Sequence, residues 1–165
     1  MILELSPDNI LFKKAVEICD YIFDDPPSYE KYSLRFSKNK HIHMIVDIID
    51  DMSIEGNEKI IRGVCIYEII TDYMQIVHVN DLCTVEKYRN QGVATGLLEY
   101  IKLNNVNNYL SLYVSANNKN AFNLYQKLNF YEINRFQNGY KDRGYGIYTG
   151  EGTTAILMLC NPLSF

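Results

Sequence analysis

Hydrophobic residues recur along this chain with two different spacings, and these spacings predict its secondary structure. Near the N-terminus, apolar residues three or four positions apart indicate one face of a helix: Leu11, Ala15, Ile18 and Ile22. The run Ser6-Pro7-Asp8 before them is typical of a helix start, with Ser6 as the predicted cap. The run Asp24-Asp25-Pro26-Pro27 predicts the end of this helix, because proline cannot continue it.

The rest of the chain predicts alternating strands and helices. Runs that alternate or are rich in β-branched residues predict strands at 2–5, 41–49, 60–70, 74–85, 109–114, 130–136 and 153–160. Helical spacing predicts further helices at 29–36, 92–101 and 118–128. We expect a polar turn at 50–58, a hairpin-length link at 71–73 and a glycine-rich loop at 137–152.

This order of elements limits the fold class. Antiparallel strands followed by strand-helix-strand units predict an α/β (α+β) layer on a mixed sheet, and not a doubly wound nucleotide-binding fold. With 165 residues, the chain is expected to form a single domain over residues 1–165.

One stretch, LCTVEKYRNQGVATGLLEYI at 82–101, predicts a strand, a turn and a helix that begins near Gly92. Val93, Leu97 and Ile101 mark the apolar face of that helix. The first turn of a helix has backbone N–H groups without intrahelical partners and the positive end of the helix dipole. Gly92 would let a ligand approach the backbone, and Arg89 adds a positive charge. The turn therefore predicts a site for a phosphate or diphosphate.

The phosphate motif in this turn is neither of the two commonest ones. The chain has no G-x-x-x-x-G-K-[ST] run, and Gly92 and Gly96 have the wrong spacing for G-x-G-x-x-G. Instead, residues 89–94 read R-x-x-G-x-A, which resembles the acetyl-coenzyme A signature [QR]-x-x-G-x-[GA] of the GNAT superfamily of N-acetyltransferases.

A second segment, NKNAFNLYQKLNF at 118–130, resembles the later GNAT motif N-x-x-A-x-x-L-Y-x-K-x-G-F. The positions that match are Asn118, Ala121, Leu124, Tyr125, Lys127 and Phe130. Asn129 replaces the usual glycine, and asparagine tolerates the left-handed conformation that a helix C-terminus often needs. The resemblance covers residues 74–136 well and the flanks by element order only.

The resemblance implies a GNAT-type fold, with a mixed sheet of about seven strands flanked by about four helices. In that family two central strands, here 76–84 and 109–114, separate and admit the pantetheine arm of acetyl-CoA. The residues implied in cofactor binding are Leu82, Cys83, Thr84, Arg89, Asn90, Gln91, Gly92, Val93, Ala94, Thr95, Asn118 and Tyr125. Asn118 would also serve well as a helix N-cap.

Acetyl transfer to an amine needs an acid for the departing thiolate and a base for the amine. The resemblance implies Tyr125 as the acid, although a tyrosine at this spacing is also a common core residue. An alkylamine has a pKa of about 10, so a proton must be removed. The candidates are His78, Asp81 and Glu68, and we prefer His78 because its ordinary pKa lies near neutrality. His78 and Asp81 would point to opposite faces of a regular strand, and would act together only if a bulge intervened.

Composition adds several exclusions. The net charge of −4 argues against nucleic-acid binding. The four cysteines lie in apolar runs without zinc spacing, which predicts reduced core thiols, no metal and a cytoplasmic protein. We expect no signal peptide and no membrane span.

The leading hypothesis is therefore an N-acetyltransferase that uses acetyl-CoA as cosubstrate and acts by direct attack of a primary amine in a ternary complex. The alternatives are a noncatalytic acyl-CoA sensor of the same fold and a binder of another phosphate ligand. Aromatic residues at Tyr29, Tyr32 and Phe36 and in the loop 137–152 would flank the acceptor side. The acceptor stays open between a small-molecule amine and a peptide or protein amine, as does a homodimer.

Overall fold

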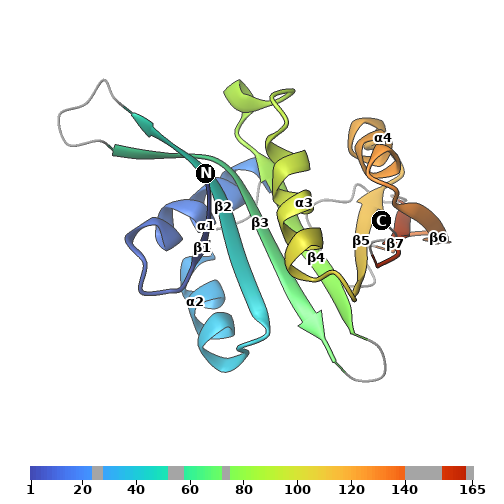
Figure 1. The fold of residues 1–165 in the computed structure, drawn as a ribbon, viewed down its shortest axis with the longest axis horizontal. Coiled ribbons are helices and arrows are strands. Elements are labelled where there is room, and N and C mark those ends of the chain that lie inside the picture. The colour runs from blue at the N-terminus through green and yellow to red at the C-terminus, as the bar shows by residue number, and fades with distance from the viewer. Residues whose placement is uncertain (24–27, 52–57, 72–74, 140–153, 163–165) are drawn as a thin grey trace.

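The computed structural model describes residues 1–23, 28–51, 58–71, 75–139 and 154–162. Seven strands in the described residues form one mixed sheet in the order β1-β2-β3-β4-β5-β7-β6 (Figure 1). All neighbouring strands are antiparallel except β4 and β5, which run parallel. The strands are β1 (Ile2–Leu5), β2 (Ile42–Asp51), β3 (Glu58–Ile70), β4 (Ile76–Thr84), β5 (Tyr109–Ser115), β6 (Tyr131–Phe136) and β7 (Ala155–Cys160).

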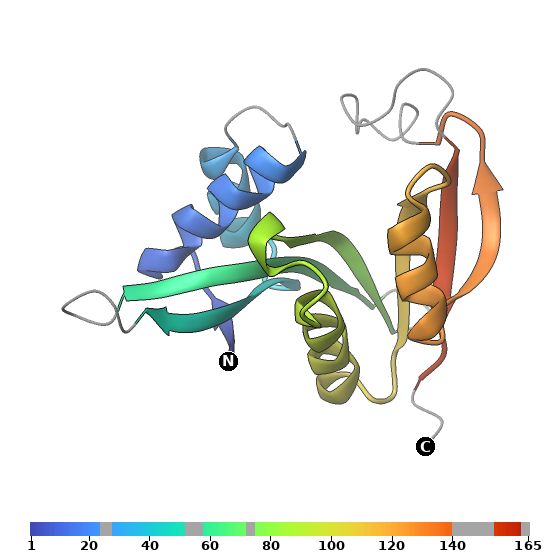
Figure 2. The same cartoon turned by 90° about the horizontal axis from the view of Figure 1, so that it is seen from above.

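Four α-helices in the described residues cover the sheet, together with one short 3₁₀ helix. They are α1 (Ile10–Phe23), α2 (Tyr29–Lys38), η1 (Glu86–Tyr88), α3 (Val93–Asn104) and α4 (Lys119–Lys127). Seen from above, α1 and α2 lie on one side of strands β1 to β4 and α3 lies on the other (Figure 2). The predicted mixed sheet of seven strands with four flanking helices is confirmed.

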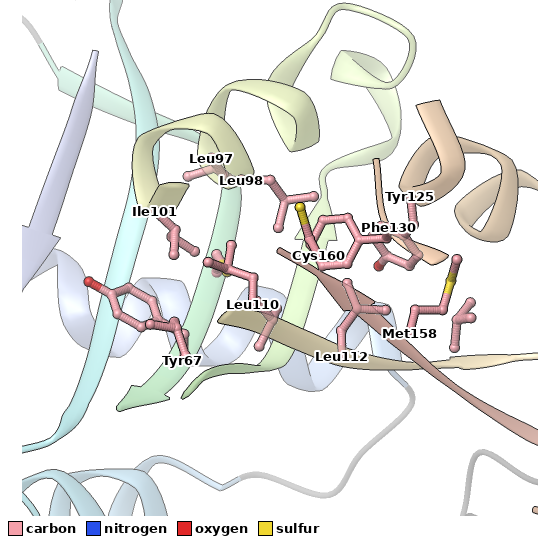
Figure 3. Close-up of a cluster of buried hydrophobic side chains, with 14 of the residues drawn as sticks. Tyr67, Leu97, Leu98, Ile101, Leu110, Leu112, Tyr125, Phe130, Met158 and Cys160 are labelled. Atoms are coloured by element: carbon pink, nitrogen blue, oxygen red, sulfur yellow. The ribbon is translucent and has the colours of Figure 1, made fainter. Parts of the chain in front are cut away.

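The core has two parts because the sheet is covered on both faces. One cluster joins α1 and α2 to the sheet through residues such as Phe12, Val16 and Ile66. The other lies under α3 and α4 and includes Leu97, Leu98 and Leu112 (Figure 3). Continuous apolar runs in the central strands follow from this two-sided burial.

The first helix differs in detail from the prediction. It begins at Ile10 rather than in the Ser6-Pro7-Asp8 run, where Ser6 O instead accepts a hydrogen bond from Asn9 N and closes a turn. The cap is Asn9, whose Oδ1 accepts from Leu11 N at 2.9 Å. The buried face is also rotated from the predicted one, and its residues are Phe12, Ala15, Val16 and Cys19.

Other element boundaries moved by a few residues, and η1 was not predicted. Several expected connections lie outside the described residues: 24–27, most of the turn at 50–58, 72–73 in the hairpin link and 140–152 of the glycine-rich loop.

Candidate active site

Strands β4 and β5 pair over only four positions, from Ile76 with Tyr109 to Val79 with Leu112. Beyond that point, residues 81–84 of β4 pair with β3 alone, and residues 113–115 of β5 pair with β7 alone. The two strands separate there, as Figure 2 shows. Their inner edges carry backbone groups that no neighbouring strand takes up, which suits them to bind a polar, extended ligand. The separation implied by the family resemblance is confirmed.

A β-bulge lies at the point of separation. Tyr67 of β3 is opposite Val79, but the next residue, Ile66, is opposite Asp81. Asn80 therefore has no partner on β3. A one-residue insertion of this kind reverses the alternation of side chains beyond it.

The bulge places His78 and Asp81 on the same side of β4. His78 is opposite Glu68, which accepts hydrogen bonds from Arg35 and Asn39 around α2 at 3.2 and 2.7 Å. Asp81 accepts a hydrogen bond from the hydroxyl of Tyr32 on α2 at 2.9 Å. Both side chains therefore lie on the α2 side of the sheet. The bulge that the two residues would need in order to act together is present.

His78 is held by two residues of β5 that the sequence reasoning missed. The Nδ1 atom lies 2.8 Å from Oγ of Ser111, which is directly opposite it in the parallel pair. The ring makes an edge contact with Tyr113, with 5.4 Å between ring centroids. Alternation along β5 could have revealed both, because they share the face opposite to the buried Leu110, Leu112 and Val114.

The turn after β4 has the conformation of an open helix start. Asn90 and Gly92 both have positive φ angles, of 61° and 78°. The first helical hydrogen bond runs from Gly96 N to Gly92 O, so the amides of Val93, Ala94 and Thr95 precede it. Among the described residues, no side chain caps this end, and a Cβ atom at position 92 would meet none of their atoms within 4 Å. The predicted start of the helix is confirmed, and its backbone is accessible.

Arg89 lies beside this turn in a groove of about 940 Å³ between α1 and residues 85–89. The groove brings three cations together, Lys14, Lys87 and Arg89, and Lys14 is paired with Glu58 at 3.0 Å. Sequence reasoning did not find the contribution of α1. The lining residues are Lys14, Glu17, Ile18, Tyr21, Ile22, Val85, Glu86, Lys87 and Arg89.

Helix α4 supplies the two residues implied by the later motif. Asn118 caps the helix, because its Oδ1 accepts from Ala121 N at 3.1 Å. Tyr125 is only 8% exposed and packs against Phe130 in the cluster beneath α3 and α4 (Figure 3). Asn129 has a φ of 63°, which is the left-handed conformation that the motif's glycine would adopt.

The side chain of Cys83 points toward α1 and not toward α3. Its Sγ lies 3.6 Å from Sγ of Cys19 on α1. The hydrogen bond with Cys83 is the main cause that raises the pKa of the Cys19 thiol, and burial is the second. Burial, together with the nearby charge of Asp81, raises the pKa of the Tyr32 hydroxyl well above its usual range. These groups stay neutral and fix β4 against α1 and α2.

All four cysteines are free and buried. Among the described residues, no cluster of three or more histidine, cysteine or acidic side chains could hold a metal ion. None of the described helices combines the length and the apolar character needed to cross a bilayer.

Comparison with known proteins identifies the family. A model of the acetyltransferase (GNAT) domain matches residues 43–132, which is more than half of the chain. The chain therefore belongs to the GNAT family of N-acetyltransferases. No protein with a curated description matches the chain in sequence.

Solved structures agree in fold over nearly the whole chain. NAA60 of Arabidopsis thaliana, in complex with a bisubstrate analogue, is 18% identical with a TM-score of 0.75, covering 97% of this chain and 98% of that one. A GNAT acetyltransferase of Elizabethkingia anophelis with acetyl-CoA bound is 20% identical with a TM-score of 0.67, covering 98% and 97%. The ribosomal-protein-S18-alanine N-acetyltransferase of Escherichia coli is 19% identical with a TM-score of 0.70, covering 100% and 96%.

Proposed function

We propose that acetyl-CoA is held by the turn at 89–95 and by the inner edge of β4 at 82–84. The observation that carries this proposal is the juxtaposition of an uncapped helix start with two strands that stop pairing after four positions. The amides of Val93, Ala94 and Thr95 would bind the diphosphate, with Asn90, Gln91 and Gly92 shaping the turn and Arg89 adding charge. Backbone groups of Leu82, Cys83 and Thr84 would bind the pantetheine arm. When bound, acetyl-CoA supplies the acetyl group as a thioester.

His78 is the proposed base for the acceptor amine. Its contacts with Ser111 and Tyr113 fix the orientation of the imidazole ring at the point where β4 and β5 separate. Asp81 lies on the same side of β4, and its carboxylate would attract a cationic amine before the proton is removed. The imidazole ring of histidine is the side chain that most often serves as a general base in enzymes.

Tyr125 is the proposed acid. It comes from α4, on the opposite side of the sheet from α2, and packs in the cluster that includes Val79 and Leu112, the last pair before the strands separate. A buried phenol there can deliver its proton to a departing thiolate without competition from water.

The acceptor that we propose first is the α-amino group of a peptide or protein. Two of the structures similar in fold support peptide acceptors: the S18-alanine N-acetyltransferase, and the NatC complex bound to a Gag peptide at a TM-score of 0.72. An aminoglycoside 6'-N-acetyltransferase of similar fold, with a TM-score of 0.71, keeps small-molecule amines as the second candidate. Four reduced, buried thiols support a cytoplasmic location.

The first experiment measures release of free coenzyme A thiol from acetyl-CoA with a panel of peptides and small amines. Amine-dependent release is expected with at least one acceptor class, and the product should carry one acetyl group by mass spectrometry. Tight binding of acetyl-CoA with no release across the panel would instead favour the noncatalytic sensor.

Tyr125→Phe tests the acid. We expect kcat to fall by roughly ten- to a hundredfold while the Kd for acetyl-CoA stays within about twofold, because only the proton donor is removed. Tyr131→Phe is the matched control, since Tyr131 lies on the exposed β6 and bonds Asn161. Unchanged turnover in Tyr125→Phe would remove Tyr125 from this role.

His78→Ala tests the base. The variant should lose the limb of the pH profile of kcat/KM near neutrality, with His41→Ala, an exposed histidine, as control. A pH profile identical to that of the parent protein would move the role to another group.

A further inference from the structure

Asn80 is the one residue of β4 that has a partner on neither neighbouring strand. It is the inserted residue of the bulge, without a partner on β3. It is also the first residue beyond the last pair with β5, which joins Val79 and Leu112. No other residue of β4 combines these two properties.

The side chain of Asn80 carries an unsatisfied donor. Its Nδ2 atom is buried and has no hydrogen-bond partner in the part of the chain that the structure describes. The one other such atom there is Nε of Arg62, and that guanidinium already binds both carboxylate oxygens of Asp47 at 2.9 and 2.8 Å. Among the described residues, Asn80 is thus the one with a buried side-chain amide donor that is left over.

A structural role does not explain this amide. Asparagine is favoured in irregular backbone when its side chain bonds a nearby backbone group, and the Nδ2 of Asn80 makes no such bond. Buried donors are nearly always paired, because an unpaired one destabilises the fold. An apolar residue at position 80 would therefore make the fold more stable. A role of the amide in ligand binding would explain why an asparagine stands there instead.

We propose that Nδ2 of Asn80 donates a hydrogen bond to the thioester carbonyl oxygen of acetyl-CoA. This inference rests on the proposed function, in which the acyl end lies between β4 and β5. From the turn at 89–95, an arm that follows β4 inward passes residues 84 to 82 and then reaches Asn80, where the strands close. A donor on the carbonyl oxygen holds the acyl group in place and opposes the negative charge that this oxygen gains during attack by the amine.

The test compares two ligands that differ only in the acyl group. Acetyl-CoA and coenzyme A are titrated by calorimetry into the parent protein, Asn80→Leu and Asn80→Ala. The Kd for acetyl-CoA should rise by about three- to tenfold in both variants, the range of one lost hydrogen bond, and that for coenzyme A should stay within twofold. Asn107→Leu, an exposed turn residue, is the matched control and should change neither value.

A stability measurement separates ligand binding from a structural role. The melting temperature of ligand-free Asn80→Leu should equal or exceed that of the parent protein, because the unpaired donor is gone. A lower melting temperature with equal weakening of both ligands would make Asn80 a structural residue and overturn the proposal. Equal weakening with an unchanged melting temperature would overturn it as well, because the amide would then contact the part that both ligands share.

A vibrational measurement reports on the carbonyl directly. The carbonyl stretch of bound acetyl-CoA labelled with ¹³C at the carbonyl should be lowered in the parent protein and return toward its free value in Asn80→Leu. The same stretch in both proteins would overturn the proposal. Failure of the proposed function looks different: the parent protein itself would then bind neither ligand.

Discussion

The two helices that follow the separating strands begin in opposite ways. Helix α3 follows β4, and its first amides receive no side-chain cap after a left-handed Gly92. Helix α4 follows β5, and its own N-cap residue closes it: Oδ1 of Asn118 accepts a hydrogen bond from Ala121 N at 3.1 Å. Both starts lie at the same edge of the sheet, because β4 and β5 are parallel. The difference teaches that one end is complete by itself, whereas the other keeps free amides, which suits the proposed binding of an anion.

The two helices also differ in how firmly they are packed. Four residues of α3 are buried, Val93, Leu97, Leu98 and Ile101, whereas α4 buries Tyr125 alone. The uncapped helix is thus the one that the core holds rigidly. A binding site built from backbone amides needs that rigidity, because their positions cannot be adjusted by rotamers.

The largest effect is expected where α3 meets the sheet. A Cβ atom at Gly63 would lie 2.5 Å from Cγ1 of Val93 and 2.9 Å from the carbonyl oxygen of Cys83. Gly63→Ala should therefore lower the free energy of unfolding by about 1–3 kcal/mol and weaken acetyl-CoA binding, since the start of α3 must shift. Denaturant unfolding and calorimetry measure the two effects. Unchanged affinity would show that the helix start need not be fixed.

The next effect concerns the turn itself. Gly92→Ala places a side chain in the left-handed region, which costs about 1–2 kcal/mol of stability. Because no atom of the part of the chain that the structure describes lies within 4 Å of that Cβ, a loss of affinity would indicate a clash with the ligand itself. We expect the Kd for acetyl-CoA to rise by roughly tenfold or more. A loss of stability with normal affinity would contradict the anion site.

The matching change at the other helix should affect stability more than binding. Asn118→Ala removes the cap of α4 and should cost about 1 kcal/mol, measured by denaturant unfolding. Asn118→Asp keeps the cap but adds a negative charge, so its effect on acetyl-CoA affinity reports how near the diphosphate lies. If Asn118→Ala weakens binding as much as Gly92→Ala does, the contrast between the two helix starts is wrong.

The smallest expected effect is a gain in stability. Gly96 lies inside α3 and has open space where a Cβ would be placed. Gly96→Ala should raise the free energy of unfolding by about 0.5–1 kcal/mol through helix propensity, with acetyl-CoA affinity unchanged. This variant also controls for Gly92→Ala in the same helix. A loss of affinity in Gly96→Ala would extend the ligand-binding surface one turn further along α3.

Local patterns predicted most of the fold, because the spacing of apolar residues and the residues that begin or end an element are local properties of the sequence. The spacing of Val93, Leu97 and Ile101 placed α3, and Gly92 marked its start. At α1 the same reasoning chose the wrong cap and a rotated face, because Asn9 and Ser6 are both good capping residues. The packing of Phe12 and Val16 against the sheet shows which face of α1 is buried, and the sequence alone did not show this.

By itself, the sequence identified the family and the turn that we propose to bind the cofactor, because the residues within each motif, at 89–94 and at 118–130, are close together in the chain. Only the tertiary structure decided which residues complete the site. The bulge at Asn80 is a mismatch between two strands, so no single strand reveals it, yet it brings His78 and Asp81 to one side. The contacts of His78 with Ser111 and Tyr113 likewise depend on the pairing of β4 with β5. His78 and Ser111 are 33 residues apart in the chain, so the sequence alone does not show that they meet.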